Sequence, residues 1–364
     1  MRYFPILLIL LVSISCSEQK TENGDLLVII DTVMVDANDE LIFLQSGLSH
    51  SALSSDQKKL FNFTPESKLE VIDLDDLKLQ SKISTEKEGN LGTGWPYAIQ
   101  FDQSENFVFY SFNELRIFDP NLSTMKRYSL TEDALKGLKP EILAPFNPKI
   151  TVGNELFGIY ETYETEPKGL AIVSLEDGNV EKIPLESIEK IASYTHSLFV
   201  QGRLSNRVYD PIYLALANRR LIISTAYSNE VLILDLDTKT TLIKPFHSTL
   251  TEDFTKVPVQ TRAESIDEME RIMKEREKNV KFGPFIYDSS NNQFVRFSRK
   301  LDREKGDSLI YKTILTVYDK DLNQLGETIV LADPFSKKFF KDGKLWSYVN
   351  VEDELGFAVF TFDF

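Results

Sequence analysis

The chain has 364 residues, with 41 Lys and Arg against 56 Asp and Glu and a formal net charge of −15. Its 42% hydrophobic and 27% charged residues are typical of a globular protein rather than a disordered one. The sequence pI of about 4.8 argues against nucleic acid as a partner, because phosphates favour clustered Lys and Arg. A single cysteine excludes an internal disulfide framework and a thiolate zinc site.

The first 25 residues have the pattern of an exported protein. Arg2 precedes an apolar run over residues 6–12, which is too short to span a bilayer of about 30 Å and is typical of a signal peptide. Cys16 then resembles the lipidated cysteine of a bacterial lipobox. We therefore expect a lipoprotein signal peptide over residues 1–15, and a flexible polar tether over residues 16–25 that begins with lipidated Cys16.

Two questions about this leader stay open. An ordinary signal peptide, cut near a stray cysteine, would leave the mature chain without a lipid. If Cys16 is lipidated, its acyl chains anchor the protein to a membrane. The acidic residue soon after it, Glu18, resembles the export signal of Bacteroidota surface lipoproteins. We expect an outer-membrane lipoprotein, on either the cell surface or the periplasmic face.

From residue 26 onward, short apolar runs alternate with turn signals, and Phe (25) and Tyr (14) are frequent, which indicates an all-β fold. A weak internal repeat consists of an apolar strand, a polar residue at its end and a turn. Units of this length with several short strands are typical of β-propeller blades. The polar residue recurs at Asp73, Asp119, Ser174, Asp235, Asp319 and Asp363.

These six positions predict a single β-propeller domain over residues 26–364, with six blades. The 84-residue interval between Asp235 and Asp319 leaves seven blades as an alternative, because it could hide a degenerate unit. A helix expected over residues 265–278, in an insertion near 263–279, accounts for part of this excess.

The run 26–34 is a predicted strand with no unit of its own, and the last unit is one strand short. We expect this N-terminal strand to complete the last blade, which would close the ring and protect its edges. A two-sheet sandwich could use the same strands, but its strands need not recur in units of this length.

The sequence contains no familiar catalytic or cofactor motif. The three histidines, His50, His196 and His247, lie at least 51 residues apart, and none has the spacing of a metal site. Nucleophile elbow, P-loop and dinucleotide patterns are absent. We expect no catalytic residue, metal or cofactor. The Asp-rich turns could bind Ca²⁺, but capping of hairpin turns explains them more simply.

Two segments are better candidates for ligand binding. Trp95 and Tyr97 precede a predicted innermost strand, where loops would line one mouth of a propeller and aromatic rings could stack on a sugar or peptide. Arg203, Arg207 and Tyr209 precede the corresponding strand of a later blade, and Arg binds carboxylates and phosphates through two hydrogen bonds. Packing between blades and surface ion pairs are the alternatives.

The segment 282–288, followed by 293–297, resembles the Bacteroidota lipoprotein family called domain of unknown function 4221, and the repeats resemble TolB-like six-bladed propellers. The resemblance covers nearly the whole mature chain. It implies no established activity, and of functional positions it transfers only the lipidated cysteine, onto Cys16.

We expect a lipid-anchored extracytoplasmic propeller that binds an envelope protein, a peptide or a glycan and performs no catalysis. One alternative is a hydrolase or lyase that acts on an extracytoplasmic polymer. Another is a structural subunit of an envelope complex, in which the acidic surface mainly provides solubility.

Overall fold

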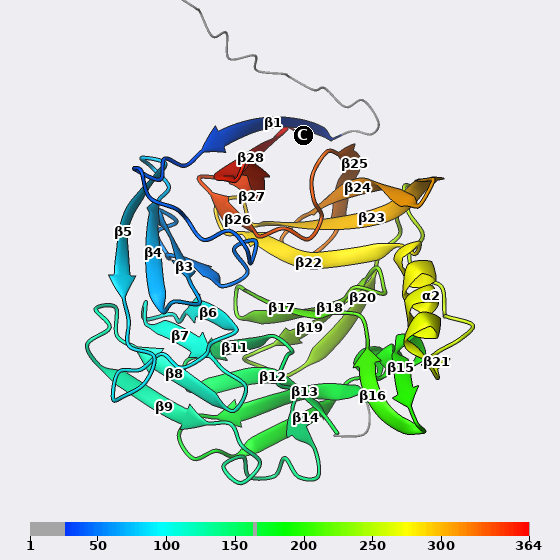
Figure 1. Ribbon diagram of the computed structural model, residues 1–364, viewed down its shortest axis with the longest axis horizontal. Coiled ribbons are helices and arrows are strands. Elements are labelled where there is room, and N and C mark those ends of the chain that lie inside the picture. The colour runs from blue at the N-terminus through cyan, green and yellow to red at the C-terminus, as the bar shows by residue number, and fades with distance from the viewer. Residues whose placement is uncertain (1–25, 163–165, 364) are drawn as a thin grey trace, which may run out of the picture.

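The computed structural model describes residues 26–162 and 166–363. Their strands form seven sheets, six of which have four or five strands, so the fold is all-β, as the sequence predicts. Figure 1 shows the sheets set around a common centre in chain order, with the colour passing from blue to red around the molecule. The expected signal peptide, Cys16 and the tether lie outside the described residues.

The first three large sheets are runs of antiparallel hairpins. The first contains β2 (Ser51–Leu53), β3 (Lys59–Phe63), β4 (Lys68–Asp73) and β5 (Lys78–Ser84). The second contains β6 (Ala98–Phe101), β7 (Phe107–Tyr110), β8 (Glu114–Phe118) and β9 (Met125–Ser129). The third contains β10 (Ile142–Leu143), β11 (Lys149–Val152), β12 (Glu155–Glu161), β13 (Pro167–Ser174) and β14 (Val180–Pro184). Both β10 and β11 pair with β12.

The other three large sheets follow the same plan. The fourth contains β17 (Ile212–Ala217), β18 (Arg220–Thr225), β19 (Glu230–Asp235) and β20 (Thr241–Pro245). The fifth contains β22 (Lys281–Asp288), β23 (Gln293–Lys305), β24 (Ser308–Tyr318) and β25 (Gln324–Val330). The sixth contains β26 (Lys338–Lys341), β27 (Lys344–Val351), β28 (Glu354–Asp363) and β1 (Leu27–Met34).

The sixth sheet combines segments from both ends of the chain. Strand β1 pairs antiparallel with β28, from Leu27 opposite Asp363 to Met34 opposite Gly356. The N-terminal strand therefore lies on the outer edge of the last sheet, beside the final strand of the chain (Figure 1).

The sequence repeat marks the same place in each large sheet, because every repeat position ends or directly follows the strand next to the outermost one. Several of these carboxylates accept backbone N–H groups of the turn that follows. Asp119 accepts from Thr124 at 2.5 Å and from Ser123 at 2.7 Å, and the bond from Thr124 contributes most to lowering its pKa to about 2. Equivalent bonds order the turns after Asp73, Asp235 and Asp319.

The 84-residue interval of the repeat is described throughout, and it holds no additional four-stranded sheet. Its excess length lies in the segment 246–280 and in the long hairpin of β23 and β24, whose strands have 13 and 11 residues. Helix α2 (Ile266–Glu277) lies in that segment. Ser265 caps this helix, because its Oγ accepts a hydrogen bond from Glu268 N at 3.2 Å.

A small side sheet lies next to α2 at the rim of the molecule (Figure 1). It contains β15 (His196–Val200), β16 (Arg203–Val208) and β21 (Arg262–Ala263). The short helices α1 (Glu186–Glu189) and η1 (Lys190–Tyr194) precede it. Arg276 of α2 donates a hydrogen bond to buried Asp210 at 2.5 Å, which ties the helix to the segment just before β17.

The hydrophobic core lies between neighbouring sheets. Central strands such as β19 are apolar on both faces over residues 231–234, as expected for sheets that are covered on both sides. Arg296 of β23 is fully buried in this core, and burial lowers its pKa to about 10. Its guanidinium donates to the carbonyl groups of Gly283 and Thr225, each at 2.9 Å, and so connects the fifth sheet to the fourth.

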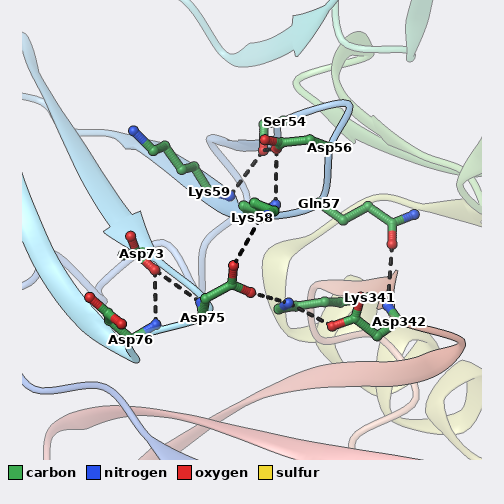
Figure 2. Close-up of polar contacts among 10 residues, drawn as sticks. All are labelled: Ser54, Asp56, Gln57, Lys58, Lys59, Asp73, Asp75, Asp76, Lys341 and Asp342. Carbon is green, nitrogen blue, oxygen red and sulfur yellow. Dashed lines mark hydrogen bonds and ion pairs between the residues drawn. The ribbon is translucent and has the colours of Figure 1, made fainter.

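The innermost strands of the six large sheets are β2, β6, β11, β17, β22 and β26. We call the side of the molecule on which these strands begin the upper face, and the side on which they end the lower face. On the lower face, Lys341 of β26 lies between the first and sixth sheets (Figure 2). Its Nζ donates to Asp75 Oδ1 at 2.5 Å and to Asp342 Oδ2 at 2.7 Å. The backbone N–H of Asp342 donates to Gln57 Oε1 at 3.3 Å. The first and last sheets therefore contact each other directly.

Leu26, which directly precedes β1, belongs to the hydrophobic core. Leu26 is 1% exposed and packs among residues of the fifth and sixth sheets, whereas Leu41 is 86% exposed. We expect Leu26→Ala to lower the free energy of unfolding by about 2–5 kcal/mol. The matched variant Leu41→Ala should change it by less than about 0.5 kcal/mol. Urea titrations would measure both, and equal effects would contradict the packing described here.

Candidate ligand-binding site

The candidate site lies on the upper face, over the second, third and fourth sheets. The backbone N–H of Tyr97 donates to Tyr110 O at 2.9 Å, which holds the loop before β6 against the end of β7. The segment before β11 contains Pro145 and Pro148, whose rings restrict its backbone. The segment before β17 contributes Tyr209. The Ala144 N–H also donates to Ile159 O of β12 at 2.8 Å, so the loops before β6 and β11 are both anchored to strands.

Three aromatic side chains from two sheets form what we name the aromatic patch: Tyr97, Phe112 and Phe146. The rings of Tyr97 and Phe112 lie 5.9 Å apart between centroids, and those of Phe112 and Phe146 lie 4.9 Å apart, edge to face. Phe112 is 45% exposed and Phe146 is 78% exposed. Exposed aromatic rings that pack mainly against one another are typical of interaction surfaces.

A chain of hydrogen bonds runs beneath the aromatic patch. Lys149 is buried, and its Nζ donates to Tyr97 Oη at 2.7 Å and to three backbone carbonyls of the segment 144–147 at 2.9 to 3.4 Å. The side-chain amide of Asn147 donates to Tyr209 Oη at 2.9 Å. These bonds connect the three sheets at one place.

Tyr209 also lines a pocket of 530 Å³ beside the patch, together with Phe146, Glu161 and Arg207. Its hydroxyl donates to Glu161 Oε2 at 3.3 Å. Burial raises the pKa of Tyr209 to about 12 and also raises the pKa of Glu161, although Tyr209, Arg207 and Lys149 partly oppose the shift of Glu161. The pocket therefore combines apolar walls with hydrogen-bonding groups of both charge signs, which suits binding of a polar or peptide ligand.

The structure brings together three of the five candidates from sequence. Tyr97, Arg207 and Tyr209 all belong to the patch or to the adjoining pocket. Trp95 is 68% exposed two residues before Tyr97, with the ammonium of Lys87 3.0 Å from its ring centroid.

The remaining member of the Arg–Tyr cluster, Arg203, is exposed at the start of β16, at the end away from Tyr209, and does not line the pocket. Arg207 lies on the same strand and pairs with Glu166 at 3.8 Å. Within the described residues, no group of three or more His, Cys, Asp and Glu side chains is placed to hold a metal ion. None of the helices in that part of the chain is long and apolar enough to cross a membrane.

Sequence reasoning missed Phe112, Phe146, Lys149 and Glu161. The one available signal was that each Phe stands in a turn with polar or proline neighbours, where an aromatic side chain has no obvious core to join. Lys149 and Glu161 gave no signal, because their burial depends on contacts between sheets.

The buried ammonium of Lys149 predicts a pH-dependent stability. Burial lowers its pKa to about 7, whereas a lysine in the unfolded chain keeps its proton to about pH 10. Between these values the unfolded state binds more protons, so the folded state gains stability as the pH rises. Relative to Lys149→Met, wild type should gain on the order of 1 kcal/mol per pH unit between pH 7 and 9. Urea titrations across this range test it, and parallel curves for the two proteins would contradict it.

One solved structure shares the fold of this chain. A solved structure of a DUF4221 family member from Bacteroides vulgatus superposes with a TM-score of 0.65 at 13% identity, covering 94% of this chain and 99% of that chain. The β-propeller domain of Cps50 (Swd1) from Myceliophteria thermophila gives a TM-score of 0.40 at 11% identity, and BamB from Moraxella catarrhalis gives 0.35 at 10%. Each of these two comparisons covers 86% of this chain and 82% of the other.

No curated protein matches the chain in sequence. The model of the family described as domain of unknown function (DUF4221) matches residues 23–329, which is well over half of the chain. The chain therefore belongs to the DUF4221 family.

Proposed function

We propose that this protein is a lipid-anchored, six-bladed β-propeller of the cell envelope that binds a protein partner through its upper face. The observation that carries the proposal is the aromatic patch of Tyr97, Phe112 and Phe146, in which Phe112 and Phe146 are exposed, the rings pack against one another, and a pocket with apolar walls and hydrogen-bonding groups adjoins them. Exposed aromatic side chains of this kind are enriched at the centres of protein interfaces.

The six large sheets support the blade count, because each repeat position ends or directly follows the strand next to the outermost one of a different sheet. Pairing of β1 with β28 supports closure of the ring by the N-terminal strand. The contact of Lys341 with Asp75 adds support, since it joins the last sheet to the first. We take the side sheet of β15, β16 and β21 as a rim insertion rather than a seventh blade.

A protein partner fits the patch better than a glycan does. Phe112 meets Phe146 edge to face, so the two rings do not form the flat platform on which a sugar ring stacks. The ring of Trp95 would suit stacking on a sugar better, but Lys87 covers one of its faces. Partner side chains could instead insert beside the rings and extend into the pocket of Glu161 and Tyr209.

Membrane anchoring through Cys16 fits the position of β1. Fully extended, the ten residues 16–25 could reach about 33–36 Å, which is enough to hold the domain clear of a membrane surface. Since β1 lies on the outer edge of the sixth sheet, such a tether would leave from the rim and not from the upper face.

The patch can be tested by capture of partners from the envelope fraction. We expect wild type to retain a specific envelope protein, and Phe112→Ser with Phe146→Ser to reduce its recovery by about tenfold or more, as for interface hot spots. Phe254→Ser is the matched control, because Phe254 is 49% exposed and lies outside the patch. Mass spectrometry with quantified recovery would measure this. Equal recovery by all three proteins would rule out the patch as the interface.

The anchor can be tested by cell fractionation. Full-length wild type should sediment with membranes and incorporate labelled fatty acid, whereas Cys16→Ser should do neither, because the thiol is the acylated group. Ser17→Ala serves as the control and should behave as wild type. If Cys16→Ser remained in the membrane fraction to the same extent, anchoring through this cysteine would be refuted.

A further inference from the structure

Two adjoining cavities occupy the centre of the molecule, away from the aromatic patch. Their volumes are 410 and 720 Å³, and both are lined by Ala215, Leu216 and Lys337. Together they are bordered by residues of all six innermost strands: β2, β6, β11, β17, β22 and β26. We name this space the central channel. Its smaller cavity has walls of mixed character, with the apolar residues Leu53, Ile99, Phe101, Ile150 and Leu214 beside polar ones such as Gln100 and Thr151.

Lys337 is the cation that both cavities share. It directly precedes β26, and its Nζ donates one hydrogen bond, to Ser51 O at 2.8 Å. An ammonium has three N–H groups, so two are left for another acceptor. Within residues 26–162 and 166–363, no carboxylate lies within 4.0 Å of this nitrogen. Burial lowers the pKa of Lys337 to about 8, and no neighbouring charge opposes the shift.

The other charged groups that line the channel have hydrogen-bond partners within their own segments. Asp102 accepts two backbone N–H groups of its own turn and the side-chain amide of Asn106. Asp333 accepts the backbone N–H of Phe335 at 2.8 Å. Lys338 donates to the carbonyl oxygens of Asp333 and Ser336 and to the Ser336 hydroxyl, and it lies 4.6 Å over the ring of Phe297.

We propose that the central channel binds a small monocarboxylate with an apolar body, and that the carboxylate pairs with Lys337. An ammonium that is partly withdrawn from water and lacks a counter-ion is unfavourable, and a ligand carboxylate would compensate it. The single available cation, Lys337, matches a ligand with one negative charge, whereas a phosphate dianion would require a second cation. The leucine, isoleucine and phenylalanine residues among the walls would contact the apolar body of the ligand. This inference is independent of the proposed partner at the upper face.

Phenylacetate is a suitable probe, with 2-phenylethanol as its uncharged analogue and inorganic phosphate as the competing anion. We expect calorimetry to show saturable binding of phenylacetate to the wild-type chain. Lys337→Met should weaken this binding by about tenfold or more, since a charge-assisted hydrogen bond is lost. Lys337→Arg should largely restore it. Lys344→Met is the matched control, because Lys344 is an exposed lysine of the adjacent strand β27 and should leave binding unchanged.

A second readout does not depend on affinity alone. Binding of an anion to the charged form must raise the pKa of the Lys337 ammonium, because ligand and proton binding are linked. NMR of the lysine side chains should show this pKa rising toward its ordinary value in saturating phenylacetate. Circular dichroism would verify that each variant is folded.

Several outcomes would overturn the proposal. These are an absence of saturable binding, equal binding by folded Lys337→Met, tighter binding of phosphate or 2-phenylethanol than of phenylacetate, or an unchanged pKa at saturation. Phenylacetate binding should persist in the variant Phe112→Ser with Phe146→Ser. The proposal for the channel and the proposal for the partner surface can therefore be confirmed or refuted independently.

Discussion

The pairing of β1 with β28 is the constraint on which the rest of the structure depends. It joins residues from the two ends of the chain over the full length of β1, so the last sheet is complete only when the chain has returned to its start. Without β1, the backbone groups of β28 would form an open edge. Leu26 and Val28 would also be missing from the core that the fifth and sixth sheets share. Pairing between strands from opposite ends of the chain thus stabilises the sixth sheet and the core that it shares with the fifth.

This arrangement explains why the upper face is suited to binding. The loops before β6, β11 and β17 are anchored to strands whose positions the surrounding sheets determine. Lys149 and Asn147 then link these loops to one another, so exposed Phe112 and Phe146 are held without a core of their own. Little conformational freedom remains to be lost when a partner binds, which favours affinity. The innermost strands also border the central channel, where no carboxylate of residues 26–162 and 166–363 lies within 4.0 Å of the Lys337 ammonium.

Much of the fold was predictable from sequence, because it rests on local patterns. Aspartates such as Asp119 recur at the end of the strand next to the outermost one in five of the six large sheets, and a carboxylate there can order the following turn. The site was predictable only in part. Tyr97 and Tyr209 precede innermost strands, a position that the repeat reveals, whereas Arg203 shares a sequence cluster with Tyr209 but lies at the far end of β16. Phe146 was missed because its neighbours are brought to it by another sheet, and no local pattern encodes that contact.

Site-specific photo-crosslinking in intact cells tests the central claim most directly. The full-length chain would carry p-benzoylphenylalanine in place of Phe112 or Phe146, and in place of Phe254 as a control outside the patch. The account predicts one discrete adduct with the same envelope protein from both patch positions and none from the control. An absence of adducts at the patch, or the same adducts from all three positions, would contradict the claim that this face is where the protein binds its partner.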